Sequence, residues 1–219
     1  MTTRRHIPAD IVQEIRAMYA EPTRSYHNLN HIDYLENKIG KVMVDFDQYK
    51  DHFNGLCYED VMDRMKLAIL FHDAIYNIWS DPTINEIRSA SLLEFTYSDR
   101  LINAGWTKDE ILSVIQCILA TGHHTKDQSN ADPLVKLFLD LDIIAMAEST
   151  EIAIWNRDQI FNEYMPKCPN YETFLINNAK FLQALVNREN VLYSPVFQKY
   201  EETIRSNIRL LIESANEEM

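Results

Sequence analysis

The sequence predicts an all-α protein, and three observations lead to this fold class. Apolar residues recur at helical spacing along most of the chain, as at Ile11, Ile15 and Met18, which is typical of amphipathic helices. The 219 residues include only 4 glycines and 7 prolines, too few for the many tight turns of an all-β protein. No segment alternates apolar and polar residues regularly enough to predict a strand. We therefore expect about nine helices in one bundle.

The first half of the chain contains five of the predicted helices. Pro8 suits the first turn of a helix that ends before Pro22. Thr107 and Glu110 have the spacing of a capping box, which predicts a helix start. Gly105 is suited to the end of the preceding helix. The four helices after the first are expected at residues 28–44, 58–79, 85–104 and 107–121.

The second half predicts four more helices, separated by loops and prolines. Pro166, Pro169 and Pro195 mark boundaries because proline disrupts a helix interior. The expected helices cover residues 134–147, 150–165, 170–188 and 196–216. We expect a single domain over residues 1–219, with the C-terminal helices of 151–219 packed on a core formed by 20–150.

Charge and composition exclude several classes of function. The net charge of −12 disfavours binding to a nucleic-acid polymer, whose phosphates an acidic surface repels. No apolar run approaches the about 18 residues of a transmembrane helix, and the polar N-terminus does not resemble a signal peptide. The three cysteines form no paired motif, which fits a reducing compartment. We expect a soluble cytoplasmic protein, and the sequence leaves a homodimer open.

A histidine and an aspartate lie side by side at the end of an apolar run. The run of Leu67 to Phe71 should be buried, and His72 and Asp73 should be buried with it. A buried charge is costly unless it is paired or coordinates a metal ion. A divalent cation bound by these two side chains would remove that cost.

Two further side chains complete a candidate ligand set. His31 and Asp142 join His72 and Asp73, which gives two imidazoles and two carboxylates from three helices. Asp140 competes with Asp142, because residues two apart on a helix point about 200° apart, and we favour Asp142. This donor set suits one divalent ion such as Mn, Fe, Co, Ni, Zn or Mg, with coordination positions left for water and substrate.

Five motifs in order along the chain carry a resemblance to a known family. They are Tyr26-His-Asn-Leu-Asn-His31, Phe71-His-Asp-Ala-Ile-Tyr76, Asn85-Glu86, Thr121 with His124, and Leu139-Asp-Leu-Asp142. Together they resemble the HD superfamily of metal-dependent phosphohydrolases, and most closely a bacterial group of small HD proteins. The first motif is also similar to a segment of cyclic-nucleotide phosphodiesterases. The resemblance is strong over residues 20–150 and weak in the C-terminal helices.

The resemblance implies roles for individual residues. His31, His72, Asp73 and Asp142 match the metal ligands of the family. His27 matches the histidine that protonates the leaving oxygen in the phosphodiesterases. Asp73 could also bridge to a second, weakly held ion, although the adjacent pair His123 and His124 does not match the separated histidines of firmly two-metal members. The resemblance therefore implies one tightly held metal.

Other residues are assigned from their position in the sequence beside these motifs. Glu86 is a candidate general base, or a residue that orients a ligand or the water. Arg24, Arg88 and Lys126 are the cations expected near a phosphate. His124 is expected either to line the pocket or to cap a helix.

The chain departs from its relatives in the helix after Asp142. The relatives tend to carry an arginine before a Glu-Tyr pair, whereas this chain has Asn162 before Glu163 and Tyr164. They also carry an arginine in the following helix, where this chain offers Lys180. If those arginines contact the substrate, the specificity of this protein differs from theirs.

The expected function is hydrolysis of a small phosphate ester, a nucleotide or a related metabolite, by a metal-activated water. A second hypothesis is a metal-binding sensor or scaffold without turnover. A third is a metal-dependent oxygenase or lyase, which the missing separated histidines disfavour.

Overall fold

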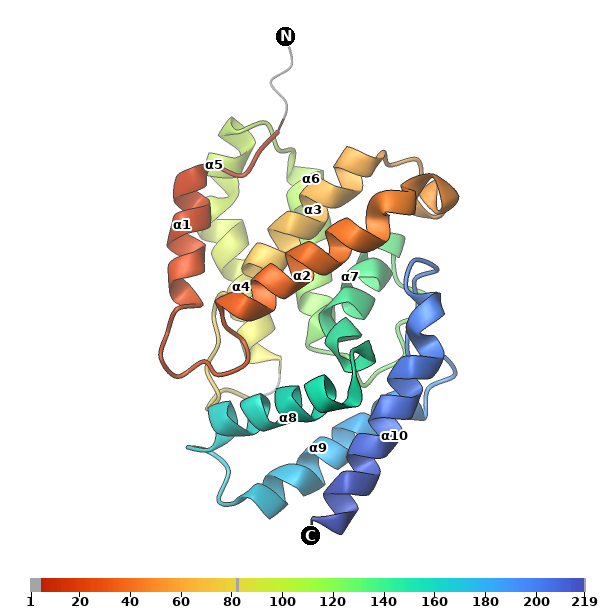
Figure 1. The fold of residues 1–219 in the computed structure, drawn as a ribbon. Helices are drawn as coiled ribbons and strands as arrows, with labels where there is room; N and C mark the ends of the chain where they lie inside the picture. Colours follow the sequence, from red (N-terminus) through yellow and green to blue (C-terminus); the bar gives the residue numbers. More distant parts are fainter. Residues whose placement is uncertain (1–4, 82, 219) are drawn as a thin grey trace.

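The protein is an all-helical bundle in a computed structural model that describes residues 5–81 and 83–218 (Figure 1). The predicted fold class is confirmed, since the described residues contain helices and turns and no strand. The α-helices are α1 (Ala9–Met18), α2 (Leu29–Val42), α3 (Tyr58–Phe71), α4 (Ile84–Leu92), α5 (Ser98–Asn103), α6 (Lys108–Thr121), α7 (Pro133–Ile143), α8 (Thr150–Tyr164), α9 (Tyr171–Val186) and α10 (Glu201–Glu217). Short 3₁₀ turns follow α2 and α7 and precede α10.

Helix α3 is shorter than the sequence predicts, and this is a correction. The predicted helix of 58–79 ends at Phe71, so His72 and Asp73 lie where the chain leaves the helix rather than inside it. The reason is a set of contacts that replace helical hydrogen bonds. The Asp73 N–H donates to the Tyr19 hydroxyl at 3.1 Å, and Arg24 binds the carbonyl oxygens of Asp73 and Ala74 at 2.6 and 2.9 Å.

The predicted helix of 85–104 is divided into two. A π-helical turn at Leu93–Tyr97 joins α4 to α5, and Gly105 follows with a φ of 97° that favours glycine. The capping box at the start of α6 is present as predicted. The Thr107 hydroxyl accepts the Glu110 N–H at 3.3 Å, and the Glu110 carboxylate accepts the Thr107 N–H at 2.8 Å.

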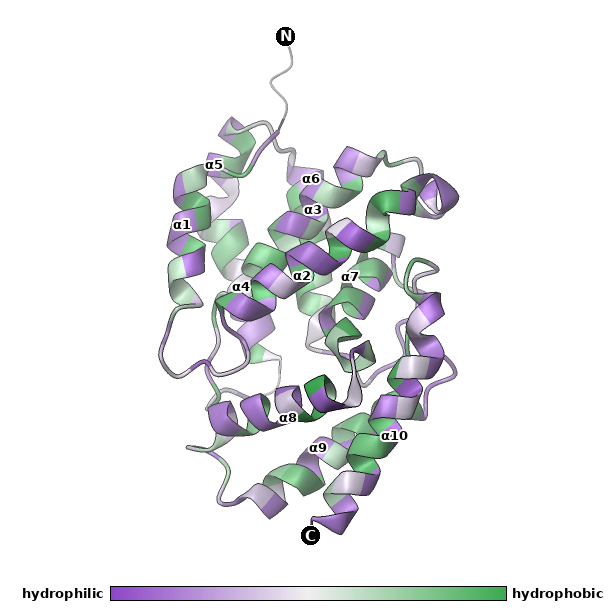
Figure 2. Cartoon of the chain, in the orientation of Figure 1, coloured by the Kyte–Doolittle hydropathy of each residue, from purple (hydrophilic) through white to green (hydrophobic). Residues whose placement is uncertain are grey.

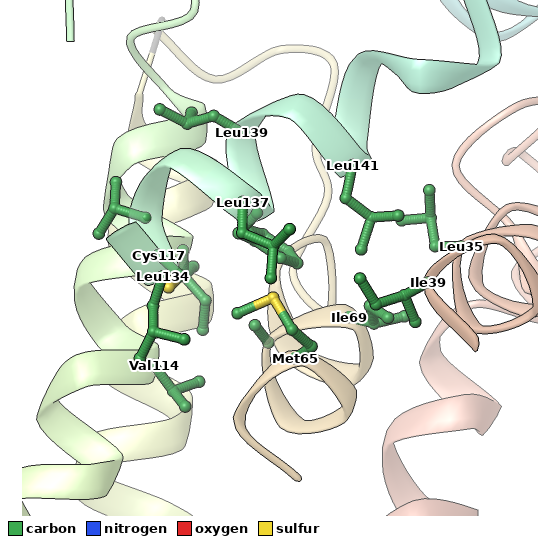
Figure 3. Packing of buried hydrophobic residues seen from close by; sticks show 14 of the residues in the cluster. Leu35, Ile39, Met65, Ile69, Val114, Cys117, Leu134, Leu137, Leu139 and Leu141 are labelled. Atoms are coloured by element: carbon green, nitrogen blue, oxygen red, sulfur yellow. The ribbon is translucent and has the colours of Figure 1, made fainter. Parts of the chain in front are cut away.

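The apolar faces of α2, α3, α6 and α7 form the centre of the core (Figure 3). Figure 2 shows that the outer side of α2 is hydrophilic and that much of α7 is hydrophobic. Ile39, Ile69 and Leu141 meet in the part of the core between α2, α3 and α7. Their burial holds the three helices that carry the candidate ligands in fixed relative positions, because interiors pack at crystal-like density.

The C-terminal helices α8, α9 and α10 pack against one another below the N-terminal bundle in the view of Figure 1. A small second apolar cluster of Phe174, Leu175 and Ala215 lies among them. Among the described residues, no helix combines the length and the apolar character that a membrane span requires.

Candidate metal centre

Four polar side chains converge where α2, the end of α3 and the end of α7 meet. The His31 and His72 Nε2 atoms are 3.3 Å apart. Asp73 Oδ2 is 3.0 Å from His72 Nε2, and Asp142 Oδ1 is 3.5 Å from both imidazole nitrogens. One ligand atom from each of His31, His72 and Asp73 lies within 4.8 Å of the others. The structure thus brings together all four candidate ligands.

Local structure explains how these side chains reach one place. Asn28 caps α2, and its side-chain oxygen accepts the Asn30 N–H at 2.9 Å, which puts His31 in the first turn of the helix. His72 closes the last turn of α3, with its N–H donating to the Ala68 carbonyl at 2.9 Å. Asp142 lies in the last turn of α7. Three helix ends therefore point at one small volume.

The hydrogen bonds of His72 leave a lone pair facing the other ligands. Its Nδ1 is 2.9 Å from the Ile69 carbonyl oxygen. A carbonyl only accepts, so Nδ1 carries the proton, and in the neutral ring Nε2 is an acceptor. That Nε2 faces Asp73, Asp142 and the nitrogen of His31. A second proton on the ring or a cation between these atoms must satisfy the group, because a buried cluster of acceptors is otherwise unstable.

The donor set fits a divalent cation. A metal-bound histidine usually donates its other N–H to a carbonyl or carboxylate, as His72 does to Ile69. Two ligands about 2.0–2.2 Å from one ion are about 3–3.5 Å apart when they occupy neighbouring positions. The separations of 3.0, 3.3 and 3.5 Å that the two imidazole nitrogens make with each other and with the carboxylates agree with that geometry.

Electrostatics show how strongly the two carboxylates act on the imidazoles. Burial alone would lower the pKa of His72, but Asp73 and Asp142 outweigh burial and hold this pKa well above its ordinary value. His31 has a lowered pKa because burial dominates there. Burial would raise the pKa of Asp142, yet hydrogen bonds from the surrounding histidines keep it well below its ordinary value. The carboxylates are therefore ionised and available to a cation at neutral pH.

The two aspartates of α7 have different partners. Asp142 Oδ2 is 2.9 Å from His124 Nε2, which leaves Oδ1 directed at His31 and His72. Asp140 is completely buried away from the centre, where it accepts the N–H groups of Tyr193 and Ser194 at 2.9 and 2.6 Å. The structure therefore puts Asp142, and not Asp140, beside the imidazoles. His124 orients Asp142.

A carboxylate that the sequence analysis left without a role holds His27. Glu163 is buried in α8, and its Oε1 is 2.6 Å from His27 Nδ1. Its Oε2 accepts the backbone N–H groups of Tyr26 and His27, each at 3.0 Å. Nδ1 of His27 therefore carries a proton, and Nε2 is the free end of the ring. The sequence shows Glu163 only as part of a Glu-Tyr pair, because its partner His27 lies 136 residues away along the chain.

Burial and neighbours act in opposite directions on His27. Burial lowers its pKa, but the charges of Asp73 and Glu163 outweigh this, and the pKa is raised. The ring also stacks on Tyr76, with centroids 4.3 Å apart. His27 is thus held in one orientation and protonated over a wider pH range than a free histidine.

Glu86 faces the centre from α4. Its Oε2 is a buried atom without a hydrogen-bond partner among the described residues. Burial raises its pKa, and the charges of Asp73 and Asp142 raise it further. A buried carboxylate oxygen without a partner is a site for a water, a proton or a cation.

Arg24 has a different role from the predicted phosphate contact, and this is a correction. Its side chain is only 2% exposed, and its guanidinium binds the carbonyl oxygens of Asp73 and Ala74 and the carboxylate of Glu21. The two carbonyls belong to residues that follow α3 and lie outside its helical hydrogen bonds. Arg24 therefore fixes the backbone of Asp73.

The other two predicted phosphate cations lie on the surface. Arg88 is exposed on α4, and its guanidinium is 3.4 Å from the Ser80 hydroxyl. Lys126 is exposed in the loop before α7. Neither side chain has a contact that places it at the centre. Lys38 and Lys41 of α2 line a cavity that His31 also lines.

No family model, curated protein or solved structure matches this chain. The identification of the centre therefore depends on the sequence motifs and on the geometry described above.

Proposed function

We propose that the protein is a metal-dependent phosphohydrolase that acts on a small phosphate ester, a nucleotide or a related metabolite. The observation that carries this proposal is that His72 Nε2 lies 3.0–3.5 Å from a second imidazole nitrogen and from one oxygen of each of two carboxylates. His31, His72, Asp73 and Asp142 would hold one divalent cation. Such a cation polarises phosphoryl oxygens and lowers the pKa of a coordinated water from about 15.7 toward about 7.

His27 is the proposed general acid. Its Nδ1 proton is bound by Glu163, and its Nε2 is free to carry the proton that the leaving oxygen receives. The raised pKa of His27 keeps this proton in place near neutral pH. Glu163 would stabilise the positively charged ring before transfer and fix the ring afterwards.

Glu86 is the proposed proton acceptor for the attacking water. Its unpartnered oxygen and its raised pKa fit a carboxylate that takes up a proton during the reaction. Asp73 is the residue that could contact a second, weakly held ion, because it contacts His72 and its charge also acts on Glu86.

The test is a set of metal-dependent hydrolysis assays. The purified protein is stripped of metal and incubated with Mn, Co, Ni, Zn or Mg. It is then assayed with p-nitrophenyl phosphate, bis-p-nitrophenyl phosphate and a nucleotide panel. We expect turnover with at least one metal, and loss of that turnover in His72→Ala. The matched control is His52→Ala, which removes an exposed histidine of the 3₁₀ turn at Lys50–Phe53, outside the centre, and should leave turnover unchanged.

Two results would contradict the proposal. Turnover that survives chelation and His72→Ala would remove the metal from the mechanism. Stoichiometric metal without turnover on any substrate of the panel would favour the sensor or scaffold hypothesis.

A further inference from the structure

A cavity of about 500 Å³ lies between α2 and α8, beside the candidate metal centre. Its volume is in the range of small-molecule sites. His31 and Tyr26 form part of its wall, and their rings are 5.2 Å apart between centroids. The cavity thus begins at a candidate ligand and extends away from it along α2.

The side of the cavity formed by α8 carries an exposed aromatic ring. Trp155 lines the cavity and is 56% exposed, although a tryptophan in a soluble protein is usually largely buried. Ile152, one turn earlier on the same face of α8, is also exposed. A wide indole face beside an aliphatic side chain is a surface on which a planar ring can stack.

Where α2 meets the turn after α7, the cavity wall has a donor and an acceptor close together. Glu148, after α7, accepts the Tyr34 hydroxyl at 2.6 Å and the Lys38 ammonium at 2.9 Å, both through Oε1. No hydrogen bond among the described residues reaches its Oε2. Tyr34, Lys38 and Lys41 lower the pKa of Glu148, so the group is an ionised acceptor at neutral pH. Lys38 has further N–H donors on the same ammonium.

This pair of groups matches one edge of a planar ring. A lactam edge has an N–H donor next to a carbonyl acceptor, so it can give its proton to Glu148 and receive one from Lys38 or Lys41. Hypoxanthine, guanine and uracil have this edge. Adenine has an amino donor next to a ring nitrogen without a proton, and that nitrogen would face the carboxylate as a second acceptor.

The distance along α2 fits a nucleotide. Lys38 is seven residues after His31, which is about 10 Å along the helix. A nucleoside monophosphate spans a comparable length from its phosphate to the far edge of its base. The two lysines also give the cavity a positive local charge against the one carboxylate of Glu148, in a chain whose net charge is −12.

We infer that this cavity is the base-binding part of the substrate site and that it selects nucleotides with a lactam base, which stack on Trp155 and hydrogen-bond to Glu148 and Lys38. This inference rests on the proposed phosphohydrolase function, because it assigns the phosphate of the same molecule to the candidate metal centre. Trp155, Glu148 and Lys38 determine specificity and take no part in the hydrolysis itself.

The test is a binding experiment with IMP and AMP, which differ only at the edge in question. Binding is followed by quenching of tryptophan fluorescence in Trp79→Phe, which removes the other exposed tryptophan, with EDTA present so that neither probe is hydrolysed. We expect IMP to bind about tenfold or more tightly than AMP, the discrimination of one good two-point hydrogen-bond pairing. Adding Trp155→Phe should remove the quenching signal.

Glu148→Gln is the decisive variant. Its amide nitrogen donates where a carboxylate oxygen accepts, so the preference for IMP should fall to about threefold or less, well short of the discrimination of an intact pairing. The matched control is Glu151→Gln, a surface residue at the start of α8 outside the cavity lining, which should keep the preference. Thermal unfolding of both variants checks that they are folded.

Three results would overturn the inference: equal affinity for IMP and AMP, no change of Trp155 fluorescence on binding, or an unchanged preference in Glu148→Gln. Because the measurement needs neither metal nor turnover, it is independent of the hydrolysis assay. A protein that discriminates IMP from AMP but hydrolyses nothing would contradict only the proposed function. A hydrolase without the discrimination would contradict only this inference.

Discussion

Two clusters of acidic side chains in this protein are neutralised in different ways. Near the N-terminus, Arg5 binds the carboxylates of Asp60, Asp63 and Glu110. At the candidate metal centre, Asp73 and Asp142 face only imidazole nitrogens, and no lysine or arginine side chain among the described residues contacts either carboxylate. The cluster near the N-terminus therefore contains a cation that the protein itself supplies, the guanidinium of Arg5.

The difference separates a structural role from a chemical one. A guanidinium with five N–H donors satisfies three carboxylates permanently and leaves no position for a ligand. The imidazole lone pairs of the second cluster can be satisfied by a proton or by a metal ion. A metal ion exchanges water and substrate, which an arginine side chain cannot do. Substitutions in the two clusters should therefore have different effects on metal binding and on stability.

The largest effect is expected from removing a candidate ligand. His72→Ala should weaken metal binding by more than the about 10- to 100-fold that loss of an outer hydrogen-bond partner costs. Metal content after dialysis, and the metal dependence of thermal unfolding, are the measurements. At a metal concentration about 100 times the Kd, the wild type should gain about 2.7 kcal/mol of stability.

The matched control for His72→Ala lies in the other cluster. Asp63→Asn removes a carboxylate bound by Arg5, and it should leave metal content unchanged. Equal loss of metal in both variants would mean that the ion is bound nonspecifically by surface carboxylates.

A smaller effect, on kcat, is expected from Glu163, which binds His27. Glu163→Gln should lower kcat about 10- to 100-fold while the metal content is retained, as for outer partners of other sites. The raised pKa of His27 depends on Asp73 and Glu163 against the effect of burial. A general acid acts when protonated, so kcat falls as pH rises through this pKa. In the variant that fall should move to lower pH.

The pH profile distinguishes this role from a structural one. A loss of kcat by the same factor at every pH, with no shift of the profile, would mean that Glu163 only supports the fold. Glu163→Asp, which keeps the charge, should retain more of the wild-type profile than Glu163→Gln.

A stability effect without a functional one is expected for the arginine of the first cluster. Arg5→Gln should lower the free energy of unfolding by about 1–3 kcal/mol, because three partly buried carboxylates lose hydrogen bonds from a charged donor. Chemical denaturation measures the loss. Metal affinity should be unchanged, and a metal affinity that falls with this stability would contradict the independence of the two clusters.

The smallest effect is expected in acid. Arg5 is the main cause that lowers the pKa of Asp60 from 3.8 to about 2. A lowered pKa in the folded protein stabilises it above the unfolded value, and this contribution is lost as pH falls through the folded value. Between pH 3.8 and about pH 2, Asp60→Asn should therefore lose less stability than the wild type. Parallel stability curves for the two proteins would exclude this role of Arg5.

The helices were predictable because their signals are local. Helical spacing, the capping box at Thr107 and the glycine at 105 each depend on residues within a few positions. The end of α3 was not predictable in this way. It depends on Tyr19 and Arg24, which bind the backbone of residue 73 from 54 and 49 positions away.

The same distinction between local signals and distant contacts applies to the candidate site. The motifs of the sequence named His31, His72, Asp73 and Asp142, and the structure brings these side chains together. The part contributed by α8 was missed, namely Glu163 behind His27 and Trp155 in the cavity wall. A buried carboxylate and an exposed tryptophan acquire their roles from distant partners, and the sequence around each is ordinary for a surface helix.

The central claim is that His31, His72, Asp73 and Asp142 bind one divalent cation. The most direct measurement is anomalous diffraction from crystals grown with Mn or Zn, recorded on both sides of the absorption edge of the metal. A single strong peak should lie within about 2.0–2.3 Å of the two Nε2 atoms and of an oxygen from each aspartate. Density with no such peak, and with His72 directly hydrogen-bonded to Asp73 in millimolar metal, would contradict the account.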